Sequence, residues 1–125
     1  MLIDTDVLIW NLRGNIKAAD LLDNTGGFTL SAITYMELIQ GIRDKAELRT
    51  LRKAFRYWKA TIHPVDVEIS TRAMFLMETY ALSHSLQIAD ALIASTAITL
   101  GEELVTANDK HYRMIEDLQI TVFRP

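Results

Sequence analysis

The stretch that decides the fold is the opening one, MLIDTDVLIWNL at residues 1–12. Its apolar start, Met1–Ile3, predicts a short buried strand, and Val7–Asn11 predicts a helical turn. A strand that passes almost directly into a helix is typical of α/β proteins with a largely parallel sheet. Two acids, Asp4 and Asp6, follow the strand, at the sheet edge where clefts form in such proteins.

The rest of the chain repeats this alternation of short β-forming runs and longer helical patterns. The other predicted strands are Phe28–Leu30, Thr61–His63, Glu103–Thr106 and Thr121–Phe123. The other predicted helical segments are Ile16–Asn24, Lys45–Ala60, Gln87–Leu100 and Lys110–Ile115, and Gly101 is expected to end the third of these. Two more helices are predicted from their N-caps: one runs from Ser31 through Ile42, and one begins after Asp66. The inner face of the helix after Asp66 consists of Ile69, Ala73, Leu76, Met77 and Tyr80. We predict one α/β domain, residues 1–125, with a mostly parallel, twisted sheet of 4–5 strands flanked by helices.

Composition excludes several classes of protein. The chain has 125 residues, no Cys, and 13 Lys plus Arg against 16 Asp plus Glu, a net charge of -3. Without Cys there are no thiol nucleophiles, thiolate metal sites or disulfides. The opening segment lacks the basic start of a signal peptide, and Thr79–Gly101 is too polar to span a bilayer, so we expect a cytoplasmic protein with no membrane partner.

Acids stand alone in three long windows that contain no Lys or Arg. Residues 1–12 carry only Asp4 and Asp6, residues 24–42 only Glu37, and residues 79–101 only Asp90. Their apolar neighbours predict partial burial, which is costly for an unpaired carboxylate. Two explanations remain: a base brought from elsewhere by the fold, or a shared cation.

The positions of the acids favour the cation. Asp109 follows the predicted strand Glu103–Thr106 as Asp4 follows the first strand, and Glu37 and Asp90 are predicted in the first turns of helices. If these four converge on one edge, each like-charged pair at 4 Å costs about 4 kcal/mol at an effective dielectric of 20. A divalent ion relieves that repulsion, and oxygen ligands select Mg²⁺ or Mn²⁺ over zinc.

Each acid also has a simpler interpretation. Asp4 or Asp6 would cap the helical turn at Val7, and Asp109 would cap the last short helix. Glu37 and Asp90 would each be a buried acid paired with a distant Arg. Only their joint occurrence in base-free surroundings argues against these separate explanations.

Four segments in this order and spacing resemble the acidic motifs of PIN-domain ribonucleases, and most of all VapC-type toxins of toxin–antitoxin pairs. They are Leu2–Ile9, Ser31–Gly41, Ile88–Ala94 and Leu104–Asp109. The resemblance implies a PIN-like three-layer sandwich and an endoribonuclease that hydrolyses RNA phosphodiester bonds with Mg²⁺ or Mn²⁺. It also implies a VapB-type antitoxin as partner and a homodimer.

By the same resemblance, the metal-binding and catalytic carboxylates are those of Asp4, Glu37, Asp90 and Asp109, with Thr5, Asp6 and Thr106 in support. Asp6 departs from the family pattern, in which Asn or Ser is common. Whether Asp6 binds metal directly stays open. The three histidines, His63, His84 and His111, are interpreted as structural or surface residues.

RNA needs an attractive surface that an acidic site does not supply. Residues 43–59 hold seven bases against two acids, a net +5, which leaves -8 for the rest of the chain. The candidate RNA-binding residues of this segment are Arg49, Arg52, Lys53 and Arg56. Its apolar stripe is predicted to pack on one neighbour, or to dock the antitoxin or a second protomer; it consists of Leu48, Leu51, Phe55 and Trp58.

Two rival functions remain at this point. The Asp4-Thr5-Asp6 sequence is similar to the nucleophile and acid pair of haloacid-dehalogenase-type phosphatases, although a later Lys and a paired-acid motif are not found. A domain that binds RNA or protein without cutting is the non-enzymatic rival. It predicts no metal-dependent cleavage.

Overall fold

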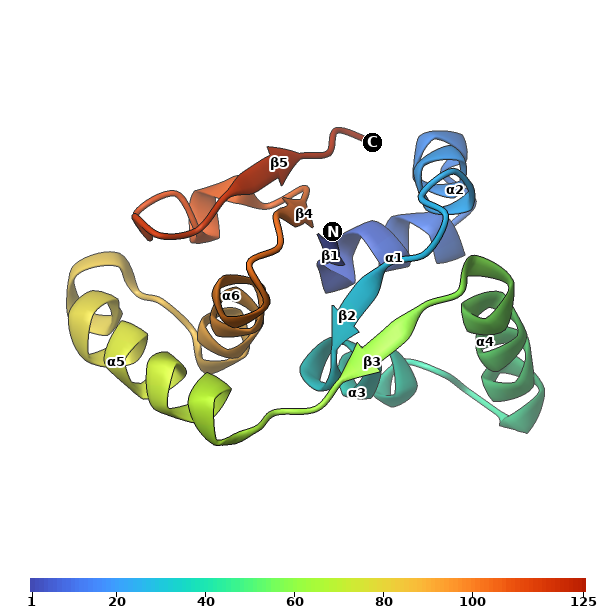
Figure 1. Cartoon of the computed structure of the whole chain (residues 1–125). Helices are drawn as coiled ribbons and strands as arrows, with labels where there is room; N and C mark the ends of the chain where they lie inside the picture. Colours follow the sequence, from blue (N-terminus) through green and yellow to red (C-terminus); the bar gives the residue numbers. More distant parts are fainter.

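The computed structural model describes all residues, 1–125, and is built on one five-stranded sheet with helices on both faces (Figure 1). The strand order is β3-β2-β1-β4-β5, and every neighbouring pair is parallel. The strands are β1 (Leu2–Ile3), β2 (Thr29–Ser31), β3 (Thr61–His63), β4 (Leu104–Thr106) and β5 (Ile120–Val122). Because all strands run the same way, the chain segments that follow them emerge at one edge of the sheet.

Six α-helices and one 3-10 turn connect and cover the strands. They are α1 (Thr5–Leu12), α2 (Ile16–Asp23), α3 (Ala32–Gln40), α4 (Lys45–Trp58), α5 (Val67–His84), α6 (Ile88–Leu100) and the 3-10 turn η1 (Asp109–His111). The Ser31 and Asp66 side chains accept backbone N–H bonds at the starts of α3 and α5, as predicted. Gly101 ends α6 at φ 65°, the left-handed conformation that glycine adopts without strain.

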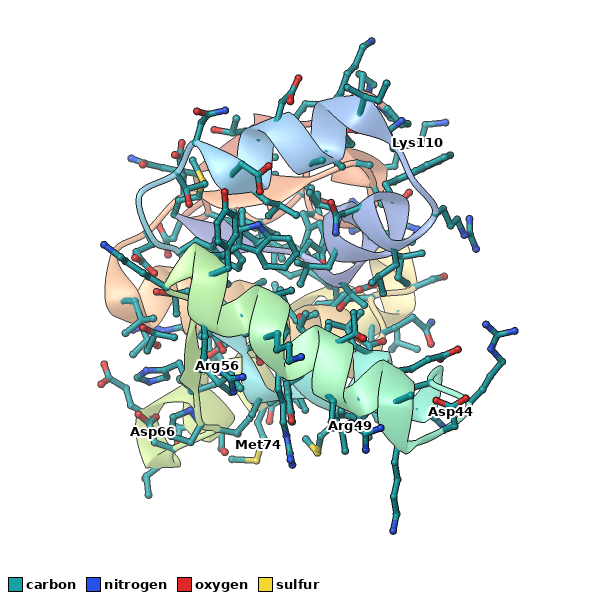
Figure 2. The ribbon with its side chains drawn as sticks, turned by 90° about the vertical axis from the view of Figure 1, so that its right-hand side faces the viewer. Asp44, Arg49, Arg56, Asp66, Met74 and Lys110 are labelled. Carbon is teal, nitrogen blue, oxygen red and sulfur yellow. The ribbon has the colours of Figure 1, made fainter.

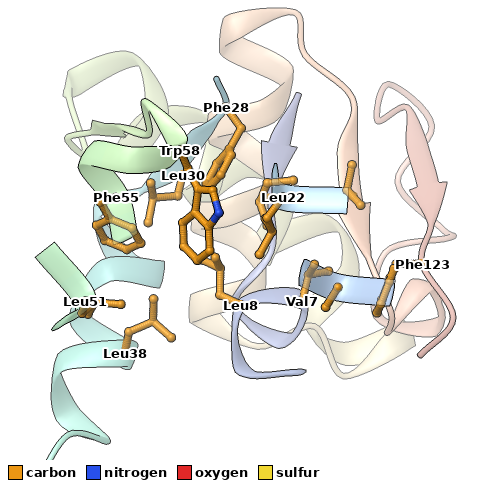
Figure 3. Packing of buried hydrophobic residues seen from close by; sticks show 13 residues of the cluster. Val7, Leu8, Leu22, Phe28, Leu30, Leu38, Leu51, Phe55, Trp58 and Phe123 are labelled. Atoms are coloured by element: carbon orange, nitrogen blue, oxygen red, sulfur yellow. The ribbon is translucent and has the colours of Figure 1, made fainter. Parts of the chain in front are cut away.

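The alternation of side chains along β1 and β4 divides the core into two clusters. Ile3 and Val105 point to the cluster formed with α1, α2 and α4 (Figure 3), whereas Leu2 and Leu104 point to the cluster formed with α5 and α6. Both faces of the central strands are therefore buried, as expected for a parallel sheet. Any displacement of β1 or β4 would therefore disturb both core clusters.

The predicted strands are confirmed to within one residue at each end, but the first helix was underestimated. Val7–Asn11 was expected to be a short turn, and the structure instead has α1 over eight residues from Thr5. The helix starts earlier because the Asp4 carboxylate accepts the backbone N–H of Thr5 as its N-cap. The first acid therefore sits at the junction of β1 and α1.

The apolar stripe of α4 was predicted either to pack on a neighbouring part of the protein or to dock a partner protein. Leu51, Phe55 and Trp58 are buried against the protein's own core, where Phe55 and Trp58 lie 6.2 Å apart between ring centroids (Figure 3). The Trp58 indole N–H also donates to Asp23 at 2.8 Å. For these three residues the prediction that the stripe docks an antitoxin or a second protomer is wrong, because the protein's own core covers them. Leu48, the first residue of the stripe, is only half-buried.

None of the helices combines the length and the apolarity that crossing a membrane requires.

Candidate active site

Asp4 lies at the carboxyl end of β1 and is almost completely buried, with 5% of its surface exposed. Its Oδ1 accepts the backbone N–H of Thr5 at 2.8 Å, and its Oδ2 accepts the hydroxyl of Thr106, the last residue of β4, at 2.8 Å. Burial, together with the nearby charge of Asp6, raises the pKa of Asp4 to about 7. No Lys or Arg pairs with it.

Asp6, in the first turn of α1, reaches the segment after β4. Its Oδ2 accepts the backbone N–H of Ala107 at 3.0 Å, while its Oδ1 is buried without any hydrogen-bond partner. Burial raises the pKa of Asp6 as well. A buried carboxylate oxygen without a partner is costly, and a cation beside Asp4 would satisfy it.

Asp90 is in the first turn of α6, as predicted, and faces two residues of the segment after β4. Its Oδ1 accepts the Tyr112 hydroxyl at 3.2 Å, and its Oδ2 lies 3.4 Å from Nδ1 of His111. Burial raises the pKa of Asp90, although the nearby His111 opposes that effect. The distant Arg considered as a partner for Asp90 is not there.

Tyr112 is a buried neighbour of Asp90 and Asp4. Only 1% of its surface is exposed, and its hydroxyl donates to Oδ1 of Asp90 at 3.2 Å. Burial and these two carboxylates hold the pKa of Tyr112 far above its usual range. The tyrosine is therefore a fixed neutral donor to Asp90. It was not predicted, because only acids and the threonines beside them were assigned to the site.

Glu37 lies elsewhere than expected. Since α3 begins at Ala32, Glu37 falls in the second turn rather than the first, and it is exposed rather than partly buried. Its Oε1 accepts the Thr5 hydroxyl at 2.7 Å, and that hydroxyl is also 3.0 Å from Oγ1 of Thr34. Through this hydrogen bond Thr5 holds Glu37 to α1, the helix that Asp4 caps.

Asp109 is the acid for which the fold does supply bases. Arg124 Nη2 lies 3.0 Å from Oδ1 of Asp109 and Arg113 Nε lies 3.6 Å from its Oδ2. Mainly through the Arg124 hydrogen bond, these arginines lower the pKa of Asp109. The alternative that Asp109 caps the last short helix is also wrong, because η1 has no side-chain cap.

The predicted convergence of the acids is only partly realised. As the side chains lie, no three His, Asp or Glu groups are placed so that they could hold a metal ion together. The Thr106 hydroxyl nevertheless lies within hydrogen-bond distance of both Asp4 and Asp6, and the Tyr112 hydroxyl donates to Asp90. All three acids have raised pKa values and no Lys or Arg partner. Carboxylate oxygens that have no Lys or Arg partner are suitable ligands for a hard divalent cation.

Comparison with known proteins agrees with this arrangement. The chain matches the PIN domain family over residues 1–117. It belongs to the PIN domain family. The resemblance predicted from the four acidic motifs is therefore confirmed.

Curated relatives of this PIN domain are ribonucleases. "Ribonuclease VapC10" of Mycobacterium tuberculosis is 35% identical over 125 residues, which cover 95% of this chain and 90% of the relative. "Ribonuclease VapC1" of Rickettsia felis is 32% identical over 126 residues, covering 96% of this chain and 93% of the relative.

Solved structures share the fold. A toxin–antitoxin complex from Klebsiella pneumoniae matches with a TM-score of 0.76 and 26% identity, over 97% of this chain and 95% of that chain. VapBC2 from Rickettsia felis, bound to a DNA fragment from its promoter, matches with a TM-score of 0.79 and 21% identity over 98% of both chains. The predicted PIN-like α/β fold is confirmed.

A hollow of about 660 Å³ lies between α1, α3 and α4 of this PIN domain, and Glu37 is the one candidate site acid that lines it. Glu37 stands on its wall, and Arg13 and Arg43 also line it. The candidate RNA-binding residues of α4 do not line it. They are exposed on the outer side of the helix, where Arg49 and Arg56 project along one edge (Figure 2); the set is Arg49, Arg52, Lys53 and Arg56.

Proposed function

We propose that this single domain, residues 1–125, is a metal-dependent endoribonuclease and the toxin of a VapBC-type toxin–antitoxin pair. The observation that carries the proposal is the pair of acids, buried Asp4 and half-buried Asp90, which lack any Lys or Arg partner and have raised pKa values. The names of the curated relatives, ribonucleases at 32–35% identity over most of the chain, support the same reaction.

Asp4 and Asp90 would hold the metal, with Asp6 beside them and Glu37 reaching in from α3. Their donors are all oxygens, which favours Mg²⁺ or Mn²⁺. A bound ion of this kind supplies an activated water and stabilises negative charge on a phosphate. Asp109 is retained as a candidate fourth carboxylate, although it would have to leave Arg124 to serve in that role.

The chain's own hydroxyls keep the carboxylates in place. Thr106 donates to Asp4, Tyr112 donates to Asp90, and Thr5 donates to Glu37. These donors fix which oxygens point toward neighbours and which are left for a ligand. Loss of a hydrogen bond that orients a metal-binding side chain commonly lowers metal affinity by roughly 10–100-fold.

RNA would be held by cationic side chains around this centre. Arg13 and Arg43 line the hollow that borders Glu37, and Arg43 is itself held by Glu47 at 2.7 Å. The exposed bases of α4, Arg49, Arg52, Lys53 and Arg56, extend positive charge beyond that hollow. Phosphate contacts of this kind attract RNA to a site that would otherwise repel it.

Similar solved structures also support a proposal about the protein partner of this chain. The Klebsiella pneumoniae structure is described as a toxin–antitoxin complex, so the proposed partner of this chain is a VapB-type antitoxin. We extend the proposal to a cytoplasmic protein that pairs with a second copy of itself. The haloacid-dehalogenase-type alternative has no support, since the chain matches the PIN domain family over nearly its whole length.

The experiment is cleavage of total RNA by the purified protein with Mg²⁺, with Mn²⁺ or with EDTA, beside Asp90→Asn. Asp117→Asn, the same change at an exposed acid outside the site, is the matched control. We expect cleavage only with metal, kept in the control and lost in Asp90→Asn. Cleavage that survives both EDTA and Asp90→Asn would overturn the proposal, and RNA binding without any cleavage would favour a non-catalytic domain.

A further inference from the structure

A second, smaller cavity lies along the segment that follows β4, and we call it the η1 cavity. Its volume is about 390 Å³, and all but one of its lining residues are polar or charged; they are Ala107, Asn108, Asp109, Lys110, His111 and Arg124. One water takes up about 30 Å³ in the liquid. The η1 cavity therefore has room for a polar group much larger than a water molecule.

The η1 cavity adjoins two of the acids that lack a Lys or Arg partner. The backbone N–H of Ala107, in its wall, donates to Oδ2 of Asp6 at 3.0 Å. Nδ1 of His111, also in its wall, lies 3.4 Å from Oδ2 of Asp90, so Nε2 is the ring nitrogen left for another partner. A group bound in this cavity would therefore lie beside the candidate active site.

The charge at the η1 cavity is positive. Its one acid, Asp109, lies 3.0 Å from Nη2 of Arg124 and 3.6 Å from Nε of Arg113, so two bases offset its charge. Lys110 is exposed at the surface (Figure 2) and takes part in none of the ion pairs of this segment. Three bases against one acid leave an excess of positive charge that attracts an anion.

Arg124 is held in place at the edge of this cavity. Its Nη1 donates to the carbonyl oxygen of Ala107 at 3.0 Å, and its Nη2 donates to Oδ1 of Asp109 at 3.0 Å. A guanidinium carries five N–H donors, so three remain for a ligand. An oriented guanidinium beside an ammonium without an ion-pair partner is a combination suited to phosphate oxygens.

We infer that the η1 cavity binds a phosphodiester group of the RNA strand, next to the linkage that is cleaved, through Lys110 and Arg124, with Asn108 and His111 at its edge. The inference rests on the proposed function, because it concerns how the same site holds its substrate. The candidate RNA-binding residues of α4 do not line this cavity, so the contact is additional to theirs. It places positive charge directly beside the acids that would otherwise repel the RNA.

The competing explanation is that Lys110 is an ordinary solvated surface lysine. Its removal would then change RNA binding no more than the removal of any other exposed lysine. Lys17 on α2 is also exposed and lies outside both cavities, so it provides the matched comparison.

The test is the binding of a labelled single-stranded RNA to the full chain in EDTA, at several salt concentrations. The proteins compared are the wild type, Lys110→Gln, Lys110→Arg and the control Lys17→Gln. We expect Lys110→Gln to bind RNA more weakly and to reduce the slope of log K against log salt by about 0.7, the contribution of one phosphate contact on a single strand. Lys110→Arg should keep the slope, because the charge is retained, and Lys17→Gln should match the wild type.

A second measurement locates the phosphate. An RNA that the wild type cleaves is made with one uncharged methylphosphonate linkage, on a 2′-O-methyl sugar, at each position in turn. At a linkage next to the cleaved one, this change should weaken binding by the wild type and have a smaller effect on Lys110→Gln. The effect is smaller in Lys110→Gln because that protein has already lost the contact.

Equal slopes for Lys110→Gln and Lys17→Gln would overturn the inference, as would methylphosphonate effects that are the same in wild type and Lys110→Gln at every position. Cleavage by the wild type with Mg²⁺ or Mn²⁺, measured in parallel, separates this failure from failure of the proposed function. If the wild type cleaves RNA only with metal while Lys110→Gln binds RNA with the full slope, only the role of the η1 cavity is wrong. If the wild type neither binds nor cleaves RNA, both are wrong.

Discussion

The Tyr112 hydroxyl donates a hydrogen bond to Oδ1 of Asp90 at 3.2 Å. The two residues come from separate elements, since Asp90 is in the first turn of α6 and Tyr112 directly follows η1. Their contact closes the candidate site on the side of the core cluster formed with α5 and α6, and Tyr112 is a buried member of that cluster. The acidic site is therefore held by the same packing that stabilises the fold.

Tyr112→Phe should keep the fold and weaken the site. The ring remains to fill the core, but Asp90 loses the Tyr112 donor. The free energy of unfolding should therefore fall by about 1–3 kcal/mol at neutral pH. Metal affinity should fall as well, because the carboxylates lose their orientation. Urea unfolding without metal measures the first effect. Tyr57→Phe, at an exposed tyrosine on α4, is the control, and equal stability of the two variants would contradict this prediction.

Asp4→Asn should stabilise the metal-free protein at high pH. Because the pKa of Asp4 is about 7 when folded and 3.8 as the reference value, its contribution to stability is fully present below pH 3.8 and is lost as the pH rises through 7. At about 1.4 kcal/mol for each pKa unit, the loss amounts to about 4 kcal/mol at most.

Urea unfolding in EDTA at pH 4 and pH 8 measures that difference. The two proteins should be nearly equal at pH 4, and Asp4→Asn should be the more stable at pH 8, although it should not cleave RNA. An Asp4→Asn protein that is less stable than wild type at pH 8 would show that the buried charge is already compensated within the chain.

Arg124→Gln should lower the free energy of unfolding in a pH-dependent way, because Arg124 forms an ion pair with Asp109. The folded pKa of Asp109 is lowered, so its contribution to stability is present above its unfolded pKa and is lost as the pH falls through the lowered value. Removing Arg124 should therefore destabilise the protein at neutral pH, with the difference disappearing in acid. Unfolding curves at several pH values, with Arg52→Gln on the exposed side of α4 as control, test this. A constant difference at every pH would contradict it.

Reversing the charge of Arg52, Lys53 and Arg56 to Glu should weaken RNA binding and reduce its dependence on salt. Each phosphate contact on a single strand contributes about 0.7 to the slope of log K against log salt, so three lost contacts should reduce it by about 2. Binding to a labelled RNA at several salt concentrations measures the slope. Lys17→Glu on α2 is the control for added negative charge, and an unchanged slope would exclude this face of α4.

Much of the fold could be predicted from local patterns. Strand lengths, the caps at Ser31 and Asp66, and the end of α6 at Gly101 depend on residues close in the sequence. Asp4 was also predictable, because an acid directly after a buried strand has little freedom in where it lies. These features need no knowledge of distant contacts.

The remaining parts of the site depend on contacts between distant segments. Asp109 resembles the other acids in sequence, and its pairing with Arg124 becomes visible only when β5 lies beside β4. Tyr112 carries no carboxylate and was not considered, and His111 was interpreted as a structural or surface residue, so neither was predicted beside Asp90. The useful signal was their position after β4, in the same segment that drew attention to Asp109.

The most direct test of the central claim is the chemistry of the cleaved ends of a defined single-stranded RNA incubated with the protein and Mg²⁺ or Mn²⁺. Attack by an activated water with departure of the 3′ oxygen leaves a 5′-phosphate and a 3′-hydroxyl. We predict these ends, formed only with metal and lost in Asp4→Asn. Metal-independent cleavage that leaves 2′,3′-cyclic phosphates would contradict the account.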